Sequence, residues 1–210
     1  MAKQEPTSRY KLIARISVFG TVFAIANAYA YKGDSQGLVE IASFEQWWTR
    51  VLRKALYVLC FVSLALLLSP TGLDDLKWEP ADTILGAFPS ILGFGIGVYA
   101  LMFIMPSDFL SFLKTRKLQG AKIGPEMVPV DMGYPLMTYV FVMFLAVMNK
   151  IYDDIYIFKF VSLWALFYGL AMTVELVSFL FMSSRMIQKI RSADNDKSKS
   201  YLRRRSRKSS

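Results

Sequence analysis

Four long apolar stretches constrain the fold of this chain more than any other feature of its sequence. They comprise residues 51–69, 82–105, 134–150 and 157–182. A helix needs about 20 mainly apolar residues to cross a hydrocarbon core of about 30 Å, and the four stretches lie close to that length. We therefore predict an all-α integral membrane protein built as a bundle of four transmembrane helices.

The residue inventory argues against an enzyme. The chain has no histidine, and its single cysteine, Cys60, lies within the first apolar stretch. A disulfide within the chain, a zinc site and a Cys/His nucleophile pair are therefore excluded. The loops contain no phosphate-binding G-x-x-x-x-G-K motif and no metal-ligand spacing. We predict no catalytic residue, no metal site and no cofactor.

The segments between the spans alternate in charge, and this alternation predicts the topology. If the N-terminal segment together with the start of the first span up to Lys54, the loop 107–133 and the C-terminal tail share one side, that side holds 22 of the 25 Lys and Arg residues. Basic residues favour the cytoplasmic face, so we predict that both termini are cytoplasmic. The short outer loops suit a bacterial inner membrane.

These expectations divide the chain into segments. A cytoplasmic or interfacial N-terminal segment covers 1–48. The predicted spans are 49–69, 82–106, 134–151 and 157–183. Outer loops cover 70–81 and 152–156, an irregular cytoplasmic loop covers 107–133, and a basic cytoplasmic tail covers 184–210.

Residues 12–31 leave three interpretations open. Basic residues before a short apolar run, followed by Ala28-Tyr29-Ala30, are typical of a signal peptide. A fifth span would have only about 16 apolar positions after Arg15, below the usual minimum of about 17. The third interpretation, which we favour, is a cytoplasmic or interfacial segment that is either helical or a β-hairpin.

Small residues form a stripe along the second predicted span. Gly86, Ser90, Gly93 and Gly97 fall within an arc of about 60° on a helix. Helices in membranes associate by close approach of their backbones, which small residues spaced by three or four permit. The stripe predicts helix packing, either within the chain or between copies in a homo-oligomer, and a pore lining is a further alternative.

The fourth predicted span contains a carboxylate, Glu175, well inside its apolar stretch. A charge there is costly in a bilayer, so this side chain should face protein or water. Tyr168 and Ser178 lie on the same helical face as Glu175. We interpret these three residues as an intramembrane polar site, either a hydrogen-bonded contact with a neighbouring helix or a site for an ion or proton.

The tail carries most of the net charge of +9. Residues 185–210 contain ten Lys or Arg residues against Asp194 and Asp196. Such a cluster attracts anionic lipids at the cytoplasmic face or an acidic partner protein, and we rank direct binding of nucleic acid below these. The expected binding residues are Arg203, Arg204, Arg205, Arg207 and Lys208.

Two functions of different classes fit these features. The first is a self-associating membrane anchor or sensor that recruits or regulates a cytoplasmic partner, for example as the membrane component of a bacterial defence or stress system. The second is a homo-oligomeric ion channel or pore-forming subunit lined by the second and fourth spans. We favour the first, because the predicted outer loops are short and the cytoplasmic segments are long.

Overall fold

A computed structural model describes residues 7–69, 72–73, 76, 78–102, 107–118, 124–152 and 155–206. Its elements, in chain order, are α1 (Ser8–Ala14), α2 (Ser17–Ala30), η1 (Ser35–Leu38), α3 (Phe44–Trp47), η2 (Trp48–Leu52), α4 (Arg53–Leu68), α5 (Pro80–Met102), α6 (Ser107–Leu118), α7 (Met127–Ile151) and α8 (Tyr156–Ser206). The described part contains helices and no strand, which confirms the all-α prediction. The β-hairpin considered for residues 12–31 is wrong, because this segment forms α1 and α2.

Four helices are long and apolar enough to cross a membrane: Phe44–Leu68, Pro80–Leu101, Met127–Ile151 and Tyr156–Gln188. They coincide with the four predicted spans, which supports a multi-pass membrane protein. The first combines α3, the π-helical turn η2 and α4. α7 begins at Met127 rather than near Tyr134, so Pro135 lies inside the helix instead of in its first turn. Residues 103–106, at the end of the second predicted span, lie outside the described residues.

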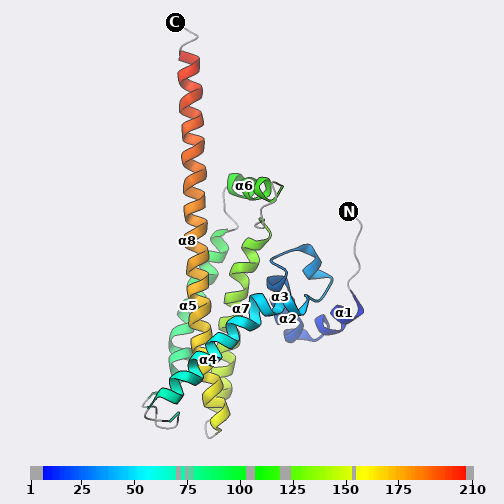
Figure 1. Cartoon of the computed structure of the whole chain (residues 1–210), viewed down its shortest axis with the longest axis vertical. Helices are drawn as coiled ribbons and strands as arrows, with labels where there is room; N and C mark the ends of the chain where they lie inside the picture. Colours follow the sequence, from blue (N-terminus) through cyan, green and yellow to red (C-terminus); the bar gives the residue numbers. More distant parts are fainter. Residues whose placement is uncertain are drawn as a thin grey trace.

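The helix α7 is the central element of the bundle. It packs against α2, α5 and α8, and these helices lie side by side in Figure 1. Of the residues in its most apolar window, 44% are buried, compared with 6% for Phe44–Leu68. The helix α4 therefore lies at the edge of the bundle, and Figure 1 shows it crossing the other helices obliquely.

Two glycines allow the helices to approach closely. A Cβ atom on Gly169 of α8 would lie 2.5 Å from the ring of Phe88 on α5, and one on Gly95 of α5 would meet the side chain of Leu136 on α7. The ring of Phe88 is also tilted against that of Tyr139, with centroids 5.6 Å apart. The glycines thus leave room for Phe88 and Leu136 to pack against the neighbouring helix, as small residues permit between membrane helices.

The N-terminal helices lie beside the bundle (Figure 1). At 14 residues, α2 is about 21 Å long and too short to cross a core of about 30 Å. The buried Asn27 ties it to the following loop, since its amide donates to the carbonyls of Gly37 and Glu40 at 2.8 and 2.7 Å. Val18 and Phe19 remain more than two-thirds exposed. Exposed apolar residues on a short helix are typical of an interfacial segment.

The helix α8 is a single helix of 51 residues that continues far beyond the ends of α5 and α7 (Figure 1). Near the end of its apolar part, Met186 and Ile187 pack against Leu113 of α6 and Val128 of α7. Much of the loop 107–133, which was predicted to be irregular, is helical, because it contains α6 and the start of α7.

Candidate functional site

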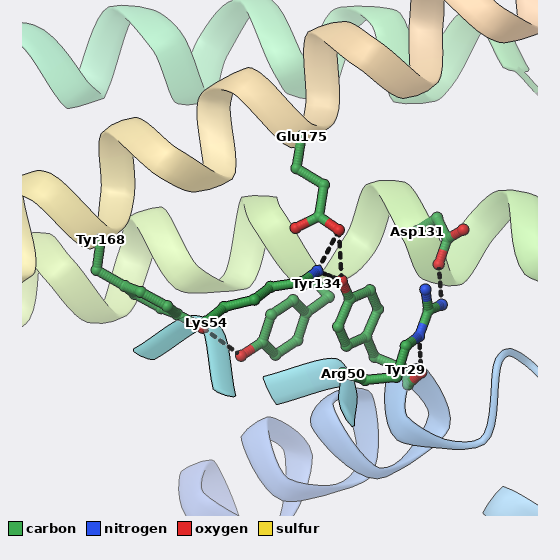
Figure 2. Close-up of polar contacts among 7 residues, drawn as sticks. All are labelled: Tyr29, Arg50, Lys54, Asp131, Tyr134, Tyr168 and Glu175. Carbon is green, nitrogen blue, oxygen red and sulfur yellow. Dashed lines mark hydrogen bonds and ion pairs between the residues drawn. The ribbon is translucent and has the colours of Figure 1, made fainter. Parts of the chain in front are cut away.

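Two ion pairs join the first apolar helix to α7 and α8 (Figure 2). Arg50, in the π-helical turn η2, donates to the carboxylate of Asp131 on α7 at 2.6 Å. Lys54, at the start of α4, pairs with the carboxylate of Glu175 on α8. Two cations and two anions leave the group formally neutral, which lowers the cost of placing charges among apolar helices.

Tyr29, near the end of α2, lies between the two pairs (Figure 2). Its hydroxyl donates to Glu175 at 2.8 Å and accepts from the ammonium of Lys54 at 2.7 Å. Its backbone carbonyl accepts from Arg50 at 3.2 Å, and the Arg50 guanidinium lies 4.3 Å from the centre of its ring. Burial, together with the nearby Glu175 carboxylate, raises the pKa of Tyr29 above its ordinary value. The hydroxyl therefore stays protonated and can donate.

A pair of tyrosines extends this group. The ring of Tyr134 on α7 stacks on that of Tyr29, with centroids 4.1 Å apart. Its hydroxyl forms a hydrogen bond of 2.9 Å with that of Tyr168 on α8, whose ring stacks on Trp164. We call the whole set the polar cluster: Tyr29, Arg50, Lys54, Asp131, Tyr134, Tyr168 and Glu175.

Comparisons with models of protein families, with curated proteins and with solved structures find no match to this chain. The geometry of the polar cluster is therefore what bears on function. The cluster connects α2, the helix Phe44–Leu68, α7 and α8 through side chains that bind one another. Chemically it is a set of ion pairs and hydrogen bonds between side chains of this chain. It acts as a clamp, in the sense that it fastens these helices to one another.

The structure separates the three residues of the predicted intramembrane polar site. Glu175 and Tyr168 both belong to the polar cluster, and Glu175 contacts the neighbouring helix α4 through Lys54. Ser178 is exposed and takes no part in the cluster. One oxygen of Glu175, Oε1, accepts from an ammonium and a phenol of the same chain.

Sequence analysis missed the partners of these residues. Arg50 and Lys54 are four residues apart and so share one face of a helix, which is a signal that both could turn inward. At the start of an apolar helix, however, such residues usually extend toward the headgroups. From the sequence, Asp131 falls in the predicted loop 107–133. Tyr29 falls in residues 12–31, for which the sequence leaves three interpretations.

The small residues of α5 lie on its outer surface. Gly86, Ser90, Gly93 and Gly97 are all exposed, and a Cβ atom on any of the three glycines would meet nothing within 4 Å. The buried Phe88 projects from the opposite side of the helix. Helix packing within the chain, the first interpretation of the stripe, is therefore not what these positions do here.

The basic residues of the tail lie at the far end of α8. The backbone of Arg203, Arg204 and Arg205 belongs to this helix. Arg207 and Lys208 lie outside the described residues. Within the described chain, no group of three or more Cys, Asp or Glu side chains is arranged to hold a metal ion.

Proposed function

We propose that this protein is a multi-pass membrane anchor or sensor that presents a helical arm to a cytoplasmic partner and associates with further copies of itself. The observation that carries the proposal is the continuity of α8. One helix runs from the apolar bundle to the basic end of the chain. A continuous helix holds its tip at a fixed position relative to the membrane. The described part of α8, Tyr156–Ser206, contains no break in the helix.

The length of the arm favours a protein partner over lipid. Residues 189–206 extend α8 about 27 Å beyond its apolar part. The headgroup layer adds only about 5 to 7 Å on each side of the hydrocarbon core. Charges act on anionic lipids within about one Debye length, roughly 8 Å at physiological salt. A basic tip held this far from the surface is better placed to bind an acidic protein surface.

The outward stripe on α5 supports self-association. Gly93 and Gly97 form a G-x-x-x-G pair on a face that contacts no other helix of the described chain. Such a pair lets the backbones of two membrane helices approach closely. We propose that this face packs against α5 of a second copy.

We further propose that both termini and α6 lie on the cytoplasmic side. The helical extension of α8 and the start of α7 are at the same end of the bundle (Figure 1), together with most of the basic residues. A bacterial inner membrane remains the location that we favour.

The channel alternative has less support. The small-residue stripe of α5 faces away from the bundle, whereas Glu175 of α8 faces α2 and α4. The two features therefore do not border a common path within one chain. One oxygen of Glu175 also accepts from Lys54 and Tyr29, and the adjacent ammonium of Lys54 opposes the binding of a further cation.

A photo-crosslinking amino acid on the arm tests the proposal. In intact cells, a crosslinker at Ser200 should give a discrete protein adduct, and one at the exposed Val174 within the apolar part of α8 should not. Arg203→Glu with Arg204→Glu should abolish the adduct. The matched reversal of two exposed cations, Arg9→Glu with Arg15→Glu, should leave it unchanged. Adducts with lipid alone at both positions would overturn the role of the arm in partner binding.

Ion flux into liposomes separates the two functions. The purified full-length protein should leave the flux at the level of protein-free liposomes. A flux that the protein produces and that Glu175→Gln abolishes would reject the anchor in favour of the channel.

A further inference from the structure

An apolar crevice lies next to the polar cluster. Its cavity volume is about 200 Å³, and its lining is almost entirely apolar. For comparison, an engineered apolar cavity of about 150 Å³ stays dry and accepts benzene. The crevice is therefore large enough for an apolar group and offers water almost no hydrogen-bonding partner.

Four elements contribute walls to the crevice. Val22 and Ala26 come from α2, Val51 and Ala55 from the helix Phe44–Leu68, and Trp164 and Tyr168 from α8. The remaining lining comes from α7. The N-terminal helix α2, which the polar cluster fastens to the bundle through Tyr29, is thus required to complete the crevice.

The longest wall of the crevice is α7, whose lining residues extend from Tyr134 to Leu145, a rise of about 16 Å. Each of the other three helices contributes two residues four positions apart, a rise of about 6 Å. A space of this volume with apolar walls from four helices can accept part of a flexible hydrocarbon chain. The stacked rings of Trp164 and Tyr168, with centroids 5.4 Å apart, provide a flat apolar surface at one side.

The surroundings of the crevice indicate the source of its occupant. Its walls include three of the four helices that are long enough to span a bilayer, and the crevice is partly open. In a bilayer the apolar parts of these three helices lie in hydrocarbon, where lipid chains are the abundant apolar molecules. We infer that the crevice is a binding site for one acyl chain of a bilayer phospholipid, held under α2. This inference is independent of the cytoplasmic partner.

Quenching of Trp164 by brominated lipid tests the inference. The full-length protein would carry Trp47→Phe, Trp48→Phe and Trp78→Phe, so that Trp164 is the remaining tryptophan. Vesicles of phosphatidylcholine with brominated acyl chains should quench its fluorescence relative to vesicles of the same lipid without bromine. Ala26→Leu and Ala55→Leu, which fill the crevice from two different walls, should each lower the quenching about twofold.

The exposed Ala100 on α5 provides the matched control, since Ala100→Leu adds the same side chain outside the crevice. This variant should leave the quenching unchanged. Circular dichroism identifies any variant that has lost its helices. If one of Ala26→Leu and Ala55→Leu is lost in this way, the quenching of the other tests the inference. Absence of quenching in the parent, or equal quenching with and without the filling side chains, would overturn the inference.

Discussion

Lys54 on α4 and Glu175 on α8 form an ion pair across 121 positions of sequence, and the hydroxyl of Tyr29 on α2 is hydrogen-bonded to both side chains. This relationship is important because α4 has few other buried contacts. Val62 is the only one of its described residues that is buried. The ion pair therefore adds to the packing of Val62 against Leu163 in holding the edge helix on α8, and its hydrogen bonds to Tyr29 join α2 to both helices.

Removing one partner of this pair should cost more than removing both. Lys54→Met leaves the Glu175 carboxylate without its ammonium, and we expect a loss of about 1–3 kcal/mol in the free energy of unfolding. Lys54→Met combined with Glu175→Gln should recover part of that loss, since no charge is then left unpaired. Unfolding in mixed micelles of mild detergent and dodecyl sulfate measures both. A loss in the double variant equal to the sum of the losses in Lys54→Met and Glu175→Gln alone would show that the pair contributes nothing beyond its separate side chains.

Arg50 should not be replaceable by lysine. Its guanidinium donates from Nε to the carbonyl of Tyr29 and from Nη2 to Asp131, and a single ammonium lacks this fork of donors. Arg50→Lys should therefore loosen α2 and increase amide hydrogen exchange across Ser17–Ala30. Arg53→Lys, at an exposed position on the next helix segment, is the control and should not change the exchange. Identical exchange in the two variants would contradict the clamp.

The four membrane spans could be predicted from the sequence, whereas the contacts of the polar cluster could not. The four spans were predictable because apolar composition over about 20 residues is a local property of the chain. Glu175 was recognisable as a charge needing a protein partner, yet the identity of that partner depends on how α4 lies against α8. No local pattern encodes that arrangement.

The start of α7 shows a second limit. Residues 127–133 are flanked by glycine and proline, and Pro135 suggested a first helical turn. In the structure Val128 and Met132 are buried, and the helix continues through Pro135. Burial against the neighbouring helices outweighs the hydrogen bond that proline removes, and such a balance is not visible from residue spacing.

Two glycine substitutions should have opposite effects on stability. Gly169→Ala places a methyl group 2.5 Å from the ring of Phe88, and we expect it to destabilise the bundle by about 1–3 kcal/mol. Gly133→Ala, on α7 and away from the proposed contact face of α5, adds the same group in open space and should be neutral or slightly stabilising, because alanine favours a helix by up to about 1 kcal/mol. The same micelle unfolding measurement compares them. A larger loss at Gly133 than at Gly169 would mean that the helices pack differently.

Self-association should depend on the stripe of α5. Gly93→Leu places a bulky side chain on the proposed contact face and should reduce energy transfer between copies labelled with donor and acceptor fluorophores in liposomes. Val174→Leu, a conservative change at an exposed position of α8, is the control. Energy transfer that is unaffected by Gly93→Leu would exclude this face from the contact between copies.

The proposed topology can be tested with single cysteines, because the one native thiol is removable by Cys60→Ser. Ser35→Cys lies in the exposed η1, Gly72→Cys in open space after α4, and Ser200→Cys on the arm of α8. An impermeant maleimide added to intact cells lacking an outer barrier should label position 72 alone, and cell lysis should expose positions 35 and 200. If position 35 were labelled from outside while position 200 was not, α2 would lie on the opposite side from the arm. Tyr29 of α2 stacks on Tyr134 in the first part of α7 and is hydrogen-bonded to Glu175 and Lys54. Such labelling would therefore contradict the placement of α2 and of the start of α7 on the same side as the arm.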